Sequence, residues 1–277
     1  MSPIGTVGTF LQVGSCSETL FNVVNRAFDA PLAADESATM PLAGGIMQHG
    51  FQCGMVWGAA FAAGAEAHRR FGTGPLAETR AVLAAQRVVE SFRDRHKSYN
   101  CVDITGLDNS SSKWQMFATF VLKGKSYKCF HMSGKYAPIA YREIEDSLSA
   151  EIAEIPAAPV SCTALLAQKI GLSDQQTVMT AGLAGGIGLC GGACGALGAA
   201  IWMMALQQLN DGANKVDYEN PEGYQMIGKF AQATRNEFEC ANIVGRTFKD
   251  VDDHAEYVRN GGCASILEAL AEALSKR

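Results

Sequence analysis

An internal repeat constrains the fold of this chain more than any other feature of its sequence. A segment that runs from Leu42-Ala-Gly-Gly-Ile to Cys53-Gly returns as a segment from Leu183-Ala-Gly-Gly-Ile to Cys194-Gly, at a constant offset of 141 residues (42 to 183 and 53 to 194). Self-similarity at a fixed period is the sequence signature of a repeated structural unit. We therefore expect two copies of one small domain.

Eight of the nine cysteines occur in the same order in the two copies. In each copy one cysteine precedes a first helix, one lies in the Gly-rich segment and two follow near the end. The first-copy cysteine group is Cys16, Cys53, Cys101 and Cys129, and the second-copy cysteine group is Cys162, Cys194, Cys240 and Cys263. The ninth, Cys190, stands where the first copy has His49. Cysteines that merely filled space in a core would have no reason to follow the repeat, so this order indicates shared chemistry.

Helical patterns dominate both copies. Apolar residues recur at three-to-four spacing over 78–95 and 266–274, and two prolines in 156–160 favour an extended linker. We therefore predict an all-α protein of two tandem homologous helical domains, residues 1–155 and 160–277, related by pseudo-two-fold symmetry. The first domain is divergent near 110–130, where residues 114–128 have no counterpart in the second copy. Their pattern fits either a short β-hairpin or a buried helix.

The charge pattern excludes several classes of protein. A net charge of −5, with no basic run interleaved with aromatics, argues against nucleic-acid binding. Residues 175–210 carry no charge and are long enough to span a bilayer, but their dense glycines and the lack of flanking basic residues favour an interior helix. The start of the chain has no export signal, which predicts a cytoplasmic protein. Thiols stay reduced there, so nine cysteines suggest metal ligands or redox thiols.

The second copy resembles the C_GCAxxG_C_C family of redox-active proteins, which is named for its cysteines and a C-G-A-x-x-G motif. Cys194-Gly-Ala-Leu-Gly198 is similar to that motif, although Gly198 comes one residue early and Ala199 holds the motif position. In the first copy, Cys53-Gly-Met-Val-Trp-Gly58 keeps the glycine spacing but lacks the alanine.

This resemblance carries expectations about a cofactor. A related domain occurs in split-Soret cytochromes, where the resemblance implies a cysteine-bound iron–sulfur centre. The chain has no C-x-x-C-H, so covalently attached haem is not expected.

Four thiolates in each copy match the ligand number of a [2Fe-2S] or [4Fe-4S] cluster, and also that of zinc. If Cys190 and Cys194 lay on one helix, their i, i+4 spacing would direct both sulfurs to one centre, and His49 and Cys53 have the same spacing. We expect a centre near Cys194, at the end of its helix and close to the interface between the copies, with the rest of its group converging on it. The candidate ligands are Cys16, His49, Cys53, Cys101, Cys129, Cys162, Cys190, Cys194, Cys240 and Cys263.

The favoured function is a redox protein that binds an iron–sulfur cluster, for electron transfer or as an oxidoreductase component. Three alternatives stay open: a metal-free dithiol/disulfide protein using Cys190 and Cys194, a zinc or soft-metal binder, and an interaction protein whose cysteines only pack. No Ser/His/Asp constellation indicates acid–base catalysis. We expect a redox partner protein of unspecified identity, no membrane or nucleic acid, and an arrangement compatible with a homodimer.

Overall fold

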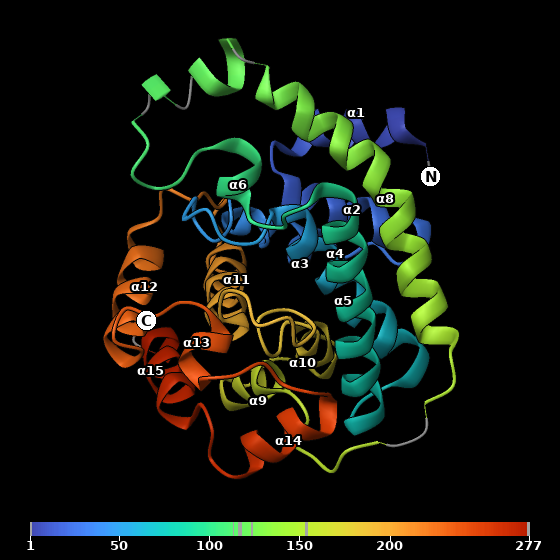
Figure 1. The fold of residues 1–277 in the computed structure, drawn as a ribbon, viewed down its shortest axis with the longest axis vertical. Helices are drawn as coiled ribbons and strands as arrows, with labels where there is room; N and C mark the ends of the chain where they lie inside the picture. Colours follow the sequence, from blue (N-terminus) through green and yellow to red (C-terminus); the bar gives the residue numbers. More distant parts are fainter. Residues whose placement is uncertain (1, 113, 116–117, 123, 153–154, 276–277) are drawn as a thin grey trace.

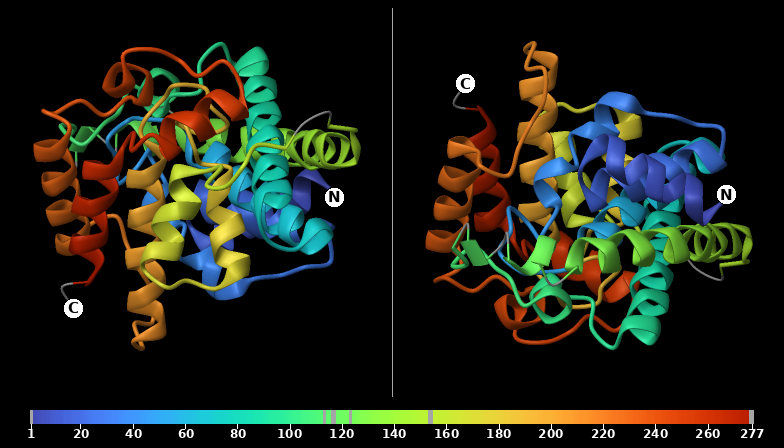
Figure 2. Two further views of the ribbon diagram at one scale, coloured as in Figure 1. Left: turned by 90° about the horizontal axis from the view of Figure 1, so that it is seen from below. Right: turned by 90° about the horizontal axis from the view of Figure 1, so that it is seen from above.

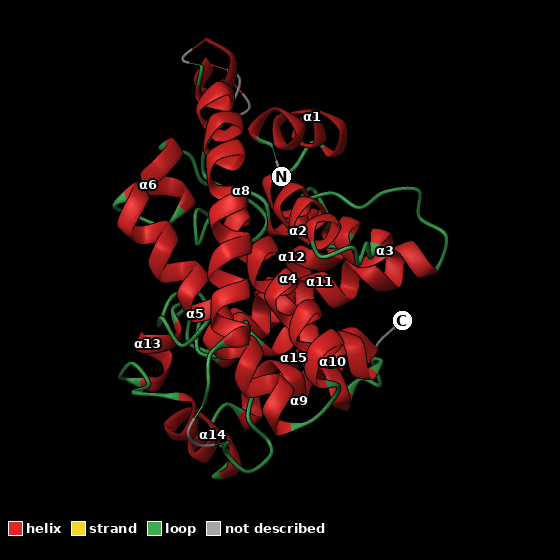
Figure 3. Ribbon diagram, turned by 90° about the vertical axis from the view of Figure 1, so that its right-hand side faces the viewer, coloured by secondary structure: helices red, strands yellow, loops and turns green. Residues whose placement is uncertain are grey.

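The computed structural model describes residues 2–112, 114–115, 118–122, 124–152 and 155–275. Within these residues the regular structure is helical, and extended pairing is limited to two isolated β-bridges. Figure 3 shows helices and loops without a strand. The prediction of an all-α protein is therefore confirmed.

The first copy is built from helices of very different lengths. They are α1 (Pro3–Val13), α2 (Cys16–Ala27), α3 (Ala33–Ser37), the 3-10 turn η1 (Met40–Leu42), α4 (Gly54–Phe71), α5 (Pro75–His96), α6 (Cys101–Thr105), the π-helical turn η2 (Ala118–Leu122) and α8 (Lys125–Ser149).

The second copy repeats the central part of this order. Its helices are α9 (Cys162–Lys169), α10 (Asp174–Ala181), α11 (Gly195–Asn210), α12 (Pro221–Ala233), α13 (Cys240–Val244), α14 (Val251–Arg259) and α15 (Ala264–Ser275). By position, α9 corresponds to α2, α10 to α3, α11 to α4, α12 to α5 and α13 to α6. The helix α1 precedes the repeated part of the first copy.

Matching cap residues start matching helices. The Ser15 hydroxyl accepts a hydrogen bond from the Glu18 amide at the start of α2, and the Ser161 hydroxyl accepts one from the Ala164 amide at the start of α9. A serine cap satisfies one of the amides left free in the first turn of a helix. The Ser-Cys pair of each copy thus fixes a cysteine as the first residue of its helix.

The two copies pack together through equivalent faces. The helix α4 of the first copy packs on α10 of the second, and α11 packs reciprocally on α3. The Trp57 ring lies over Gly198, where a Cβ atom would come 2.3 Å from the ring, and Phe61 contacts Trp202 with ring centroids 4.9 Å apart. Because equivalent residues of the two copies meet in these contacts, they lie near a pseudo-two-fold axis. Figure 1 shows α4, α10 and α11 near the centre of the molecule.

The core is continuous across the copies. Buried apolar residues of both copies form one cluster that includes Trp57 and Trp202, each fully buried. Figure 2 shows the helices of the two copies interleaved, with the two chain termini on opposite sides of the molecule. The chain is therefore one packed body made from two repeats.

The divergent segment of the first copy lies between α6 and α8. Ala118–Leu122 form the π-helical turn η2, so the β-hairpin alternative is wrong for these residues. Residues 113, 116–117 and 123 lie outside the described part of the chain. Figure 1 shows this segment at the upper edge of the molecule, where Trp114 and Leu122 are 67% and 66% exposed.

The uncharged stretch 175–210 is divided between α10, a loop and α11. Most of α11 is buried against other helices, as expected for an interior helix. Among the described residues, no helix combines the length and the apolar character that crossing a membrane requires.

Candidate cysteine centres

The repeated cysteines lie at or near the starts of helices. Cys16 and Cys162 are the first residues of α2 and α9, Cys53 and Cys194 directly precede α4 and α11, and Cys101 and Cys240 begin α6 and α13. Cys263 directly precedes α15, whereas Cys129 lies in the second turn of α8. Free amide groups and the helix dipole favour negative charge at a helix N-terminus, and such positions lower the pKa of cysteines.

Two equivalent β-bridges bring the middle cysteines of each group together. In the first copy the Cys53 amide donates to the Tyr99 carbonyl over 2.7 Å, and the Cys101 amide donates to the Phe51 carbonyl over 2.6 Å.

The second copy repeats this pairing. The Cys194 amide donates to Phe238 over 2.8 Å, and the Cys240 amide donates to Gly192 over 2.7 Å. The repeat therefore reproduces the backbone that holds each cysteine pair.

A left-handed turn precedes the second cysteine of each group. All residues of 44–48 have φ between 47° and 78°, and all residues of 185–189 have φ between 56° and 78°. Each non-glycine residue in this conformation costs about 1–2 kcal/mol. The first amide of each turn, from Gly44 or Gly185, donates toward the sulfur of Cys16 or Cys162. Backbone strain of this kind gathers at functional sites.

These turns correct one sequence-based expectation. Cys190 and Cys194 do not share a helix, because α11 begins only at Gly195; His49 and Cys53 likewise precede α4. The i, i+4 argument for a common centre is therefore wrong for both pairs. The glycine-rich segments before α4 and α11 form left-handed turns, whereas the i, i+4 argument requires a helix there.

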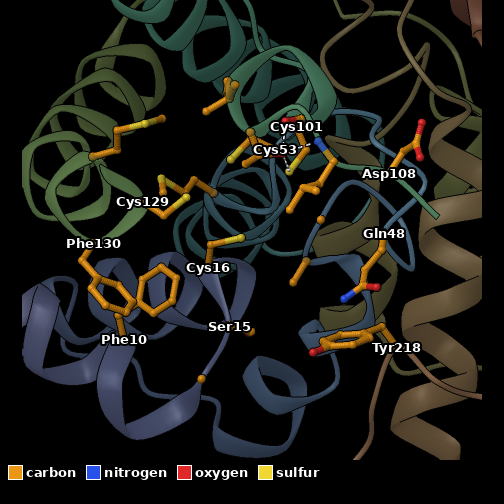
Figure 4. A pocket seen from close by; sticks show the side chains of 18 of the residues that line it. Phe10, Ser15, Cys16, Gln48, Cys53, Cys101, Asp108, Cys129, Phe130 and Tyr218 are labelled. Carbon is orange, nitrogen blue, oxygen red and sulfur yellow. Dashed lines mark hydrogen bonds between the residues drawn. The ribbon is translucent and has the colours of Figure 1, made fainter. Parts of the chain in front are cut away.

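The first-copy cysteine group lines a cavity of about 360 Å³. Figure 4 shows the four side chains around this space, with Phe10 of α1 and Phe130 of α8 on one side. These two rings pack edge to face with centroids 4.7 Å apart. The cavity thus combines four thiols with apolar walls.

Within this group, Cys16 and Cys53 share a hydrogen bond. The pKa of Cys16 is lowered mainly by the Cys53 thiol, which donates to it, and further by backbone amides that include Gly44 and Gly54. The pKa of Cys53 is raised well above its ordinary value, first by the same hydrogen bond and then by burial. Burial also raises the pKa of Cys101 to about 12. Cys16 is therefore the thiol of this pair that ionises more readily, and the Cys53 thiol stabilises its charged form.

The glycine after Cys53 leaves space for this contact. A Cβ atom on Gly54 would lie 2.5 Å from the Cys16 sulfur. In the second copy a Cβ on Gly195 would lie 1.7 Å from the Leu183 carbonyl oxygen. Close packing of the helix start therefore explains the Cys-Gly pair in both copies.

The second-copy cysteines also interact with one another. Burial is the main cause of the strongly raised pKa of Cys162, and the neighbouring Cys263, Cys194 and Cys240 raise it further. Burial raises the pKa of Cys263 to about 12. Cys162 therefore lies near enough to the other three cysteines of its group to interact with them electrostatically, and their convergence on one centre stays a prediction.

The family model described as "Putative redox-active protein (C_GCAxxG_C_C)" matches residues 15–142 and 160–276. The chain belongs to this family. The two matches confirm the family resemblance and the tandem duplication. No curated protein and no solved structure is significantly similar to the chain.

The C_GCAxxG_C_C motif is shifted in the second copy for a structural reason. At the repeat offset, Ala199 corresponds to Gly58 and Gly198 corresponds to Trp57. In the first copy a Cβ on Gly58 would come 2.1 Å from the Ser17 carbonyl oxygen, whereas Gly198 makes room for the Trp57 ring. Gly198, which comes one residue before the motif position, thus allows the close contact between the two copies.

Two candidate ligands have other surroundings in this C_GCAxxG_C_C protein. His49 Nδ1 lies 2.9 Å from the Ile46 carbonyl oxygen, and its ring stacks near Phe51. The Cys190 thiol donates to the Gly188 carbonyl oxygen over 3.6 Å, and burial raises its pKa to about 11. Charges on Arg93 and other α5 groups act on Cys190. The His49 ring also stacks near Phe238 of the second copy, with centroids 6.4 Å apart. Both residues therefore lie at the contact between the copies.

Sequence reasoning missed two polar residues that line the first-copy cavity. Gln48 comes from the left-handed turn and Tyr218 from the stretch before α12. Among the described residues, no three His, Cys, Asp or Glu side chains approach closely enough to hold a single metal ion. The thiols of the first copy instead surround a cavity.

Proposed function

We propose that this chain is a redox protein in which each cysteine group binds an iron–sulfur cluster for one-electron transfer with a partner protein. The observation that carries the proposal is the arrangement of Cys16, Cys53, Cys101 and Cys129 around one cavity of about 360 Å³. Cysteine thiolates in fours are the usual ligands of such clusters, which supply electron transfer when bound.

The surroundings of the thiols fit this use. Backbone amides directed at Cys16 stabilise negative charge, and hydrogen bonds to sulfur tune the potential of a cluster. The apolar side chains Phe10 and Phe130 line the cavity beside the thiols. The first three cysteines of the second-copy group lie at the same helix starts and beside the same bridge as their first-copy equivalents, which supports a second centre there.

Metal and acid-labile sulfide content test this proposal on protein purified without oxygen. We expect brown protein with iron and sulfide. Cys16→Ser and Cys194→Ser should each lower the iron content by about half, because each removes one of four ligands from one centre. The matched control is Cys190→Ser, which should leave it unchanged. Iron content unaffected by both ligand variants, or zinc without sulfide, would reject the cluster.

A second function, metal-free dithiol chemistry, is favoured by the Cys16–Cys53 contact. The hydrogen bond lowers the pKa of Cys16, and a thiolate beside a thiol is the reactive arrangement in dithiol redox proteins. The pair differs from Cys190 and Cys194, the pair suggested by sequence. A colourless protein without metal that forms a Cys16–Cys53 disulfide on mild oxidation would favour this function over the cluster.

A further inference from the structure

The cavity of the first copy has a polar end that the cysteines do not explain. Gln48 and Tyr218 line it together, and the Gln48 amide donates a hydrogen bond to the Tyr218 hydroxyl oxygen. Figure 4 shows the two side chains next to each other, on the side opposite Phe10 and Phe130. Tyr218 belongs to the second copy, so both copies contribute to this end.

Gln48 occupies a backbone conformation that favours glycine. Its φ is 62°, within the left-handed turn, although the residue is a glutamine and not a glycine. The equivalent residue of the second copy is Leu189, which has the same φ of about 63° but is a buried apolar residue, 6% exposed. The same left-handed turn therefore presents a half-buried amide to the cavity in the first copy and a buried apolar side chain in the second, so only the first copy offers a hydrogen-bonding group at this position.

The remaining lining defines the chemistry of that ligand. Apolar residues such as Phe10, Leu107 and Met132 dominate the walls, and Leu11 is 67% exposed. Among the described residues that line the cavity none is Lys or Arg, while Asp108 carries a negative charge. An anion would therefore be repelled, and a neutral, mainly apolar molecule would be favoured.

We propose that the Gln48–Tyr218 end of this cavity, beside the space that the four cysteines surround, binds a small uncharged quinone, with a carbonyl oxygen accepting hydrogen bonds from Gln48 and Tyr218. The proposal rests on the redox role of the protein, because neutral quinones combine an apolar ring with redox activity. A volume of about 360 Å³ falls within the range of small-molecule sites.

The donors are suited to a carbonyl. The Gln48 amide has two N–H groups, so one remains for a ligand while the other contacts Tyr218. Burial and the nearby acidic residues Asp217 and Glu219 raise the pKa of Tyr218, so its hydroxyl keeps its proton and can donate. The quinone ring would then extend along the apolar walls toward the cysteines.

Binding of duroquinone to metal-free protein tests the proposal by equilibrium dialysis without oxygen. Its four methyl groups leave no ring position open to thiol addition. Gln48→Leu, which introduces the second-copy residue, and Tyr218→Phe should each weaken binding about tenfold, the loss of one hydrogen bond. Tyr224→Phe, at a residue that is 50% exposed on α12, is the matched control and should bind normally.

A duroquinone analogue with one methyl replaced by carboxylate should bind at least about tenfold more weakly, because Asp108 repels it. Equal affinity of the wild type, Gln48→Leu and Tyr218→Phe would overturn the proposal, as would full affinity for the anionic analogue. Because the protein is metal-free, duroquinone binding does not depend on the cluster. If the metal-free protein binds duroquinone but the protein purified without oxygen contains no iron, only the cluster proposal is rejected. If the purified protein contains iron but the metal-free protein does not bind duroquinone, only the quinone proposal is rejected.

Discussion

The side-chain amide of Gln52 accepts a hydrogen bond from the backbone of Ala193, which is the residue of the second copy that corresponds to Gln52 in the repeat. The Ala193 amide donates to Gln52 Oε1 over 3.1 Å, and Gln52 Nε2 donates to the Gly186 carbonyl over 3.2 Å. A residue that contacts its own repeat equivalent lies on the pseudo-two-fold axis. Because Cys53 follows Gln52 and Cys194 follows Ala193, this contact also joins the two cysteine groups.

Gln52→Ala should destabilise the protein by about 2–4 kcal/mol, because it leaves the Ala193 amide and the Gly186 carbonyl buried without these partners. Urea denaturation of the metal-free protein measures the change. The matched control is Gln86→Ala, which removes a half-buried contact with Glu90 on the same helix. It should cost less than about 1 kcal/mol. Equal stability of the two variants would contradict a structural role for Gln52 on the axis.

The grouping of the cysteines could be predicted from sequence, because the repeat fixed their order. Ser15 and Ser161 mark the helix starts at which Cys16 and Cys162 lie, and capping residues are visible in a sequence. The predicted domain boundaries, 1–155 and 160–277, stay a prediction.

Other features of the site depend on tertiary structure. Branched or bulky residues such as Ile46 and Leu189 have positive φ, which propensity disfavours and the surrounding fold imposes. The Gln48–Tyr218 contact joins residues of different copies, and no local pattern indicates it. Sequence periodicity therefore predicted the helices and the cysteine groups, but not the turns and contacts that shape the cavity.

Gly54→Ala should separate Cys16 from Cys53, because a Cβ at this position would lie 2.5 Å from the Cys16 sulfur. We expect a loss of about 1–3 kcal/mol of stability from overpacking. Alkylation of Cys16 by iodoacetamide at neutral pH should become slower, since the hydrogen bond that lowers its pKa is lost. Thermal unfolding and mass spectrometry of the metal-free protein give both readouts.

The control for this substitution is Gly228→Ala in α12, where a Cβ would meet no atom within 4 Å. It should leave Cys16 alkylation unchanged and stabilise the helix by about 0.5–1 kcal/mol. Unchanged alkylation in Gly54→Ala would mean that the Cys16–Cys53 contact does not activate Cys16.

The metal-free, reduced protein should lose stability as the pH rises above about 8.5, where thiols of the unfolded chain ionise. Burial raises the pKa of Cys101 and Cys263 to about 12, so both keep their protons in the folded state. The unfolded state then binds fewer protons, and each thiol lowers the free energy of unfolding by about 1.4 kcal/mol per pH unit between the two pKa values. Urea denaturation from pH 7.5 to 10 measures this slope.

Cys101→Ala provides the comparison for the pH experiment. It removes one thiol with a raised pKa, so its stability should fall less steeply with pH than that of the wild type. Parallel curves for the two proteins would show that Cys101 ionises as readily in the folded state as in the unfolded chain.

The Trp57–Gly198 contact has a consequence for assembly. In a dimer of identical single units, the residue at this place would meet its own copy across the axis, so the pairs would be Trp with Trp or Gly with Gly. Two tryptophans would collide, because the Trp57 ring fits only where the facing residue has no Cβ atom. Two glycines would leave a cavity between the units. Each half has thus become complementary to the other and no longer to itself, and the covalent link guarantees that every Trp57 finds its Gly198.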